Sequence, residues 1–298
     1  MKSICPGRIL AALCLLTGWG PLKAQQETQA GFKPQVKLGL YYHSGLNYYG
    51  RTDSLQSSGA FALAELWLTR QFYINAAPVF IHNATASLQY AGTVTTAGFQ
   101  CNHRDKFAGH FYLVKPFYRE SSQLVQAALK EQLSAELTWL NPVVDLTAGA
   151  DLKFSDRTDL GAKAGLDHRF RFILPGNRVL ALVPSAYLYT GTQQFASTYY
   201  RKTGGFLLFP GTVQPVTQES GRFAILSWEF STSVVLATGH FQFLVSPAYV
   251  LPENLLTAAQ SPGGAERGKN LLYVTAGVKY SFRKYCIDFW TVPTNHSR

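Results

Sequence analysis

The stretch Val143–Leu174 reads VVDLTAGADLKFSDRTDLGAKAGLDHRFRFIL and decides the fold class. Apolar residues occupy every second position up to Phe154, and they do so again from Leu160 onward. Charged residues fall on the opposite parity: Asp145, Asp151, Lys153, Lys163, Asp167, Arg169 and Arg171. Side chains of a strand alternate between its two faces, so the pattern predicts two strands, each with one apolar and one charged face.

The same alternation, interrupted by turn residues, extends over most of the chain and predicts about twelve strands. The predicted strands are Gln35–His43, Gly59–Arg70, Phe72–His82, Ala84–Thr96, Phe107–Tyr118, Gln123–Leu140, Val143–Phe154, Leu160–Leu174, Arg178–Thr190, Ala224–Val234, Phe241–Leu251 and Leu272–Phe282. The composition of Gln123–Leu140 favours a helix, but its period of two favours a strand, and the period is the stronger signal. Pro247 inside a strand predicts a bulge or a bend, because proline cannot donate to the ladder.

Strand length and composition favour a membrane barrel. The predicted strands run to about 10–14 residues, whereas strands of soluble proteins usually have about 5–6. Charged residues make up 15% of the chain, below the roughly 25% of soluble domains. Aromatic residues cluster near strand ends, as interface girdles do. They include Tyr41, Tyr42, Trp67, Tyr118, Trp139, Phe172, Tyr189, Trp228, Tyr280 and Phe282. Only helices and closed barrels span lipid, so we predict an all-β, closed antiparallel transmembrane β-barrel. The alternative is a soluble β-sandwich or lipocalin-like barrel whose apolar face points inward.

The N-terminus has the pattern of a secretory signal peptide. Residues 1–24 read MKSICPGRILAALCLLTGWGPLKA, with a basic start, the apolar run Ile9–Leu16 and a small-residue site before Gln25. The apolar run is too short to span a bilayer. We therefore expect export with cleavage near Ala24, a barrel over 25–282 and a C-terminal tail over 283–298.

The mature chain resembles small outer-membrane β-barrel proteins of Gram-negative bacteria, in the general style of Bacteroidetes barrels of unassigned function. The ending LKAQQ of the signal and the last strand, LLYVTAGVKYSF, which ends at Phe282, carry the resemblance. It implies a location in the cell outer membrane, contact with outer-membrane lipid, and recognition by the barrel assembly machinery through Tyr280 and Phe282. The chain departs from the group in one respect, because a tail follows the terminal aromatic residue.

An even number of strands returns the C-terminus to the periplasmic side on which the N-terminus lies. The outer connections are then predicted at 44–58, 82–84, 119–122, 155–159, 191–221 and 252–270. The periplasmic turns are predicted at 70–72, 97–106, 141–142, 174–177 and 237–240. Long outer loops and short periplasmic turns are the usual asymmetry of such barrels.

Parity predicts that the lumen carries charges of both signs in nearly equal number. The predicted lumen charges are Lys37, Glu65, Lys130, Glu136, Asp145, Asp151, Lys153, Lys163, Asp167, Arg169, Arg171, Glu229 and Lys279. A channel for acidic oligosaccharides would need a clear cationic excess. The balance instead favours a narrow passive diffusion channel or a filled structural barrel. The densest cationic row, Lys163 with Arg169 and Arg171, is expected to pair with Asp151 and Asp167.

Two other functions remain as alternatives. The outer connection 191–221 carries an apolar patch, Phe206, Leu207, Leu208 and Phe209, which either packs against neighbouring loops or serves binding and uptake of a small hydrophobic ligand. A lipid-modifying enzyme would need a histidine that takes a proton from serine. His43-Ser44, His82-Asn83 and His168 form no spaced motif, so we expect no enzyme.

The cysteine pattern and the distribution of basic residues bear on disulfides, metals and nucleic acid. Cys101 and Cys286 are a candidate disulfide in an oxidising periplasm, or two unpaired thiols. No CxxC or HExxH pattern is present, so no metal and no cofactor are expected. The net charge of +10 is scattered rather than clustered, which argues against nucleic acid. The sequence does not specify a small-molecule cargo.

Overall fold

The computed structural model describes residues 32–52, 55–119, 129–193, 198–203, 212–217, 223–254 and 267–283. The chain divides into two units, Met1–Lys33 and Pro34–Arg298, and the fold described below is that of the second unit. The signal peptide and most of the tail lie outside the described residues, so the predicted domain boundaries stay predictions.

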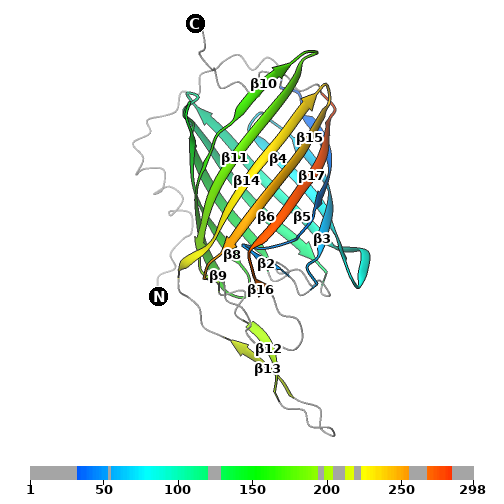
Figure 1. Cartoon of the computed structure of the whole chain (residues 1–298), viewed down its shortest axis with the longest axis vertical. Helices are drawn as coiled ribbons and strands as arrows, with labels where there is room; N and C mark the ends of the chain where they lie inside the picture. Colours follow the sequence, from blue (N-terminus) through cyan, green and yellow to red (C-terminus); the bar gives the residue numbers. More distant parts are fainter. Residues whose placement is uncertain are drawn as a thin grey trace, which may run out of the picture. The chain divides into compact units, whose positions relative to one another are not determined.

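A closed antiparallel barrel is formed by strands that pair with their neighbours along the chain (Figure 1). The wall consists of β1 (Gln35–His43), β3 (Ser58–Trp67), β4 (Phe72–Asn83), β5 (Ala86–His103), β6 (Phe107–Tyr118), β7 (Glu131–Trp139), β8 (Asp145–Phe154), β9 (Thr158–Asp167), β10 (Phe170–Leu174), β11 (Arg178–Gly191), β14 (Ala224–Thr238), β15 (Phe241–Pro252) and β17 (Leu271–Ser281). Pairing of β17 with β1 and of β9 with β11 completes the ring. The predicted fold class is confirmed.

Proline explains why one wall strand is interrupted. β9 and β10 both pair with β11 and together make one of the twelve wall strands. The break falls at His168 and Arg169, within the single predicted strand Leu160–Leu174. The His168 N–H donates to the Pro184 carbonyl at 3.2 Å, but Pro184 has no N–H to return a bond. One of the two backbone hydrogen bonds between His168 and Pro184 is therefore missing.

A second proline, Pro247 on β15, interrupts the ladder between β14 and β15. The β14–β15 ladder runs to Ser231 opposite Ala248 and resumes at Val234 opposite Val245, with unchanged register. The gap lies opposite Pro247. The predicted bulge is wrong, because the missing N–H interrupts the ladder without shifting its register, and the alternative of a bend stays a prediction.

Two predicted boundaries are also corrected. β5 continues to His103, so the turn is 104–106 and not the longer 97–106. Within it, Arg104 and Asp105 have positive φ, 51° and 54°, as the two central residues of a type I′ turn require, and the Lys106 N–H donates to the His103 carbonyl at 3.1 Å. Similarly, β7 starts at Glu131 rather than at Gln123, and residues 120–128 lie outside the described part.

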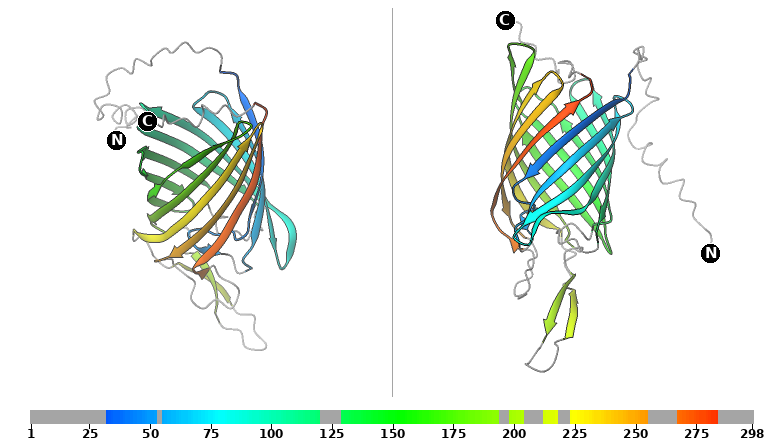
Figure 2. Two further views of the ribbon diagram at one scale, coloured as in Figure 1. Left: turned by 45° about the horizontal axis from the view of Figure 1, so that its top comes forward. Right: turned by 90° about the vertical axis from the view of Figure 1, so that its right-hand side faces the viewer.

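The barrel has short turns at one end and long connections at the other. The first end has the turns 68–71, 104–106, 140–144, 175–177 and 239–240. The other end has the long connections 44–57, 119–130, 192–223 and 253–270 together with two short turns, 84–85 and 155–157. By the usual asymmetry the second end is the outer one. The connection 192–223 contains its own hairpin of β12 (Thr198–Thr203) and β13 (Thr212–Thr217), and β2 (Arg51–Thr52) pairs with β16 (Arg267–Gly268). Figure 2 shows the wall strands from two further sides.

The exterior of the wall is apolar. Large apolar side chains point outward on strands around the barrel, among them Leu40 on β1 (63% exposed), Leu137 on β7 (53%) and Phe243 on β15 (44%). Their partners of opposite parity carry the charges, so the apolar face is the outside and the soluble alternative is wrong. Such a surface is stable in hydrocarbon, where a closed barrel leaves no unpaired strand edge. The protein is therefore a membrane-spanning barrel of the outer-membrane type.

In the described ranges, no helix has the length and apolar character needed to cross a membrane.

Candidate functional site: the barrel lumen

The lumen carries most of the charges that parity assigns to it. Twelve of the thirteen predicted residues lie on the wall strands or, for Arg169, at the β9–β10 break. Lys130 does not. It precedes β7 at the outer end, is 63% exposed and pairs with the exposed Asp156 at 2.8 Å. The structure thus places Lys130 outside the lumen and corrects that prediction.

The inward charges form ion pairs between neighbouring or nearby strands. Lys279 lies 2.8 Å from Glu65, and Lys163 lies 2.7 Å from Glu136. Lys153 pairs with Asp151 on the same strand. These pairs cancel charge locally, so the lumen has no long stretch of one sign.

The expected partners of the cationic row are only partly right. Lys163 pairs with Glu136 rather than with Asp151 or Asp167. Asp167 accepts a hydrogen bond from the Tyr187 hydroxyl at 3.1 Å and lies close enough to Arg169 for electrostatic attraction. The reason is register, because Lys163 faces Gly149 on β8 and its side chain reaches across that glycine to Glu136 on β7.

Tyrosine rings lie flat on the inner wall because glycines face them. A Cβ added to Gly277 would overlap the ring of Tyr41, and one added to Gly165 would overlap the ring of Tyr187. Gly98 has the same relation to Tyr73. Each ring covers the backbone of an adjacent strand instead of crossing the lumen. Tyr41, Tyr73 and Tyr187 therefore cover the wall rather than extend into the lumen.

A belt of polar and aromatic side chains connects the Lys279–Glu65 pair with the Lys163–Glu136 pair. The Trp67 indole N–H donates to Glu65 at 3.3 Å, and the rings of Trp67 and Tyr73 are 4.9 Å apart. The Tyr73 hydroxyl bonds His110 Nε2 at 2.9 Å, and the Tyr112 hydroxyl donates to Glu136 at 2.6 Å. The belt crosses β3, β4, β6 and β7.

The wall of β11, β14 and β15 is lined by small hydroxyl side chains instead. Ser185 bonds Ser231 at 2.7 Å, and Ser233 bonds Ser246 at 2.8 Å. Ala248 faces inward beside them. Short polar side chains thus line this stretch of the wall, directly beside the larger pair Tyr187 and Glu229.

A short hairpin narrows the outer mouth. Tyr48 and Arg51 exchange backbone hydrogen bonds of 2.8 and 3.0 Å. The two residues between them, Tyr49 and Gly50, have φ of 56° and 85°, as the central residues of a type I′ turn require. The hairpin continues into β2, which pairs with β16 of the connection 253–270 (Figure 1).

This hairpin reaches the far wall of the barrel. Lys153 of β8 lies 6.0 Å from the ring centre of Tyr48 and 5.5 Å from that of Tyr49. The Tyr49 ring is 5.1 Å from Tyr189 on β11, and Arg51 donates to Gln193. β8 is the wall strand farthest from β1 in the strand order, so the connection spans the mouth.

Side chains at the mouth are almost fully buried, whereas Lys163 farther along the lumen is partly exposed. Arg51 is 1% exposed, and the Lys153 side chain is 5% exposed, against 23% for Lys163. Burial raises the pKa of Tyr48 and of Tyr49, so both phenols stay neutral at neutral pH. From the sequence, residues 44–58 are predicted only as an outer connection. The segment Tyr-Tyr-Gly-Arg, with its glycine turn, was the available signal.

The other predicted sites have separate outcomes. The apolar patch Phe206–Phe209 lies outside the described residues, so its role in ligand uptake stays a prediction. Cys101 is a free cysteine, and Cys286 lies outside the described residues, so the disulfide is untested. No group of three His, Cys, Asp or Glu side chains suited to a metal occurs among the described residues.

The histidines considered for catalysis have other contacts. His43 Nδ1 accepts from the Gly45 N–H at 3.4 Å, and its ring stacks on Tyr273 at 4.3 Å. His82 bonds the Ser87 carbonyl at 2.8 Å. Within the described ranges, no histidine is hydrogen-bonded to a serine hydroxyl.

Neither protein-family models nor curated protein sequences give a match to this chain. Several solved structures are similar to it. A "KdgM porin" is 8% identical, with 83% of this chain and 99% of that chain covered and a TM-score of 0.47. "LpxR from Salmonella typhimurium" is 8% identical, covering 82% and 99%, with a TM-score of 0.46. An outer membrane channel from Pseudomonas putida F1 is 13% identical, covering 84% and 95%, also with a TM-score of 0.46. These similarities are too distant to carry a functional argument.

Proposed function

We propose that the protein is a narrow, weakly ion-selective passive channel for small polar solutes in the outer membrane. The observation that carries the proposal is the combination of paired charges and flat tyrosine rings in the lumen. Within each of the pairs Lys279–Glu65 and Lys163–Glu136, the two opposite charges neutralise each other. The rings of Tyr41 and Tyr187 lie against glycines rather than across the barrel. The proposal places the water path along the wall that carries Ser185, Ser231, Ser233 and Ser246.

The hairpin of Tyr48–Arg51 is the constriction of this channel. Its tyrosines touch the opposite wall at Lys153 and Tyr189. A pore is as conductive as its narrowest section permits, so this hairpin, rather than the wider middle, sets the conductance. The proposal includes export with cleavage near Ala24 and insertion by the assembly machinery through Tyr280 and Phe282.

Single-channel recording in a planar bilayer tests the proposal. We expect the refolded protein to give steady ohmic conductance with weak preference between cations and anions. Tyr49→Ala removes the ring that meets Tyr189 and should raise the conductance. Tyr249→Ala is the matched control, because Tyr249 is 39% exposed on the outer face of β15, and it should leave the conductance unchanged.

A gel assay of heat modifiability separates channel from structural barrel. Folded, heat-modifiable protein that conducts neither as wild type nor as Tyr49→Ala would refute the channel and support a filled barrel.

A further inference from the structure

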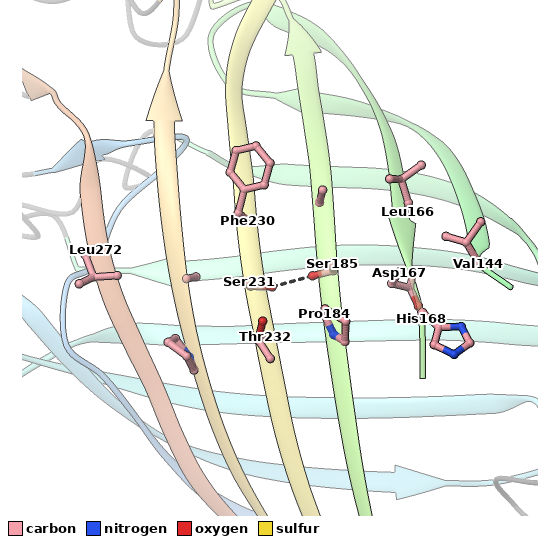
Figure 3. A pocket seen from close by; sticks show the side chains of 13 residues that line it. Val144, Leu166, Asp167, His168, Pro184, Ser185, Phe230, Ser231, Thr232 and Leu272 are labelled. Carbon is pink, nitrogen blue, oxygen red and sulfur yellow. Dashed lines mark hydrogen bonds between the residues drawn. The ribbon is translucent and has the colours of Figure 1, made fainter. Parts of the chain in front are cut away.

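An apolar groove crosses the membrane-facing surface of the barrel. It has a volume of about 520 Å³ and extends over β9, β11, β14, β15 and β17 (Figure 3). Its rim consists of outward apolar side chains, including Leu166 (50% exposed), Phe230 (44%) and Leu272 (70%). Because these residues belong to the apolar exterior, the groove opens into the hydrocarbon of the bilayer.

The two ladder gaps create this groove. Pro184 is opposite Thr232 on β14, and the unchanged β14–β15 register places Thr232 opposite Pro247. His168 donates to Pro184 from the other side. The row His168, Pro184, Thr232 and Pro247 thus crosses four neighbouring wall strands. Short or compact side chains along it leave the hollow between Leu166, Phe230 and Leu272.

The length of the groove suits a hydrocarbon chain. From β9 to β17 it crosses four strand spacings, about 19 Å at ~4.8 Å each. One leaflet of a bilayer has roughly half of the ~30 Å hydrocarbon thickness. The groove rises from His168, near the periplasmic end, toward Leu272, near the outer end of β17. A chain that lies obliquely in the periplasmic leaflet would therefore follow the part of the groove that begins at His168.

Two polar side chains on this surface have no hydrogen-bond partner in the described part of the protein. The His168 ring contacts only the edge of Phe170 among aromatic groups, at 4.5 Å, and neither that ring nor the Thr232 hydroxyl forms a hydrogen bond. A polar group without a partner in hydrocarbon is costly. His168 follows Asp167, which pairs with Asp145 at the first residue of β8. The unsatisfied ring therefore lies level with the periplasmic end of β8, at the depth of lipid headgroups.

We propose that the groove binds one phospholipid of the periplasmic leaflet, with an acyl chain along the Pro184–Pro247 row and its phosphate-ester region at His168. The apolar rim contacts the chain, and the imidazole donates to a lipid oxygen. The site is independent of the lumen and of the channel proposal.

Lipid retention in purified protein tests the site. The full chain is extracted from its membrane in detergent, and bound phospholipid is identified and counted by mass spectrometry. We expect about one phospholipid per wild-type barrel. Ala186 lies between Leu166 and Phe230, so Ala186→Phe fills the groove. The displaced methylenes lose their packing contacts with the groove, so Ala186→Phe should reduce retention several-fold.

Control variants separate the groove from the general lipid surface. Ala150→Phe adds the same ring to the outer face of β8, beside Ala135 and Ala162, and should retain lipid as wild type does. His168→Leu should reduce retention, whereas His168→Gln, which keeps a donor, should restore most of it. Heat modifiability confirms folding of each variant.

Several outcomes would overturn the proposal. They are wild-type protein without phospholipid, equal retention by Ala186→Phe and Ala150→Phe, and a bound free fatty acid in place of phospholipid. A dimer that Ala186→Phe dissociates would likewise show that a second copy, not lipid, occupies the groove.

Discussion

The paired charges of the lumen make a sharp prediction about ion selectivity. Glu136→Gln removes one charge of the Lys163–Glu136 pair, whose side chains are 23% and 18% exposed, respectively, at a separation of 2.7 Å. Glutamine still accepts a hydrogen bond from Tyr112. The variant therefore leaves one uncompensated cation at mid-lumen with little change of shape.

The size of the effect follows from Coulomb's law. An ion that passes about 7 Å from Lys163 Nζ in a water-like medium interacts by ~0.6 kcal/mol. The interaction with Lys163 is favourable for an anion and unfavourable for a cation. The interaction energies of the two ions therefore differ by ~1.2 kcal/mol, which is about sevenfold in relative permeability. A lower effective dielectric in the lumen would make the shift larger.

Reversal potentials measured across a salt gradient report this ratio directly. Glu136→Gln should shift selectivity toward anions, and Lys163→Met should shift it by a similar factor toward cations. The double variant should return close to wild type. The control is Glu131→Gln, because Glu131 pairs with Lys115 at 2.5 Å on the outer face of the wall, and its removal should not change selectivity. Two results would refute the assignment of this pair to the pore. The reversal potentials of the conducting variants do not shift, or Glu136→Gln and Lys163→Met shift them in the same direction.

The remaining predictions concern stability, assembly and the cysteines. Gly165→Ala displaces the Tyr187 ring and should lower the free energy of unfolding in lipid vesicles by about 1–3 kcal/mol. The control is Gly45→Ala, where a Cβ would make ordinary contacts at 3.7 Å, and it should change the free energy of unfolding by less than ~0.5 kcal/mol. Equal unfolding midpoints for the two variants would contradict this prediction. Phe282→Ala should reduce the heat-modifiable fraction in cells more than Phe243→Ala does, and equal fractions would exclude a role of Phe282 in assembly. Cys101 is a free thiol and should react with an alkylating reagent without reductant; reaction only after reduction would instead indicate a bond to Cys286.

Strand positions were predictable because the lipid and the lumen impose a strict alternation. β1 and β6 have the predicted bounds, and the quoted stretch forms β8, β9 and β10. The break at His168 was not predictable from its own strand, since its cause, Pro184, lies on the neighbouring strand. The end of β5 was missed because threonines and glycines from Thr93 to Gly98 blur the alternation.

The charges of the lumen were predictable as a set but not as pairs. Parity identifies the inward side, whereas the partner of Lys163 depends on the register between three strands. Lys130 was misplaced because the predicted strand started too early. The mouth hairpin was missed because its contacts, such as Tyr49 with Tyr189, join residues far apart in sequence.

Alternating accessibility along β14 tests the central claim, a water-filled lumen inside an apolar exterior. Single cysteines at Ser231, Ser233, Phe230 and Val234, in protein whose Cys101 and Cys286 are replaced by serine, are treated with a charged thiol reagent in liposomes. Inward Ser231→Cys and Ser233→Cys should react, whereas outward Phe230→Cys and Val234→Cys should not. The reverse pattern, or no reaction at Ser231→Cys and Ser233→Cys, would contradict the account.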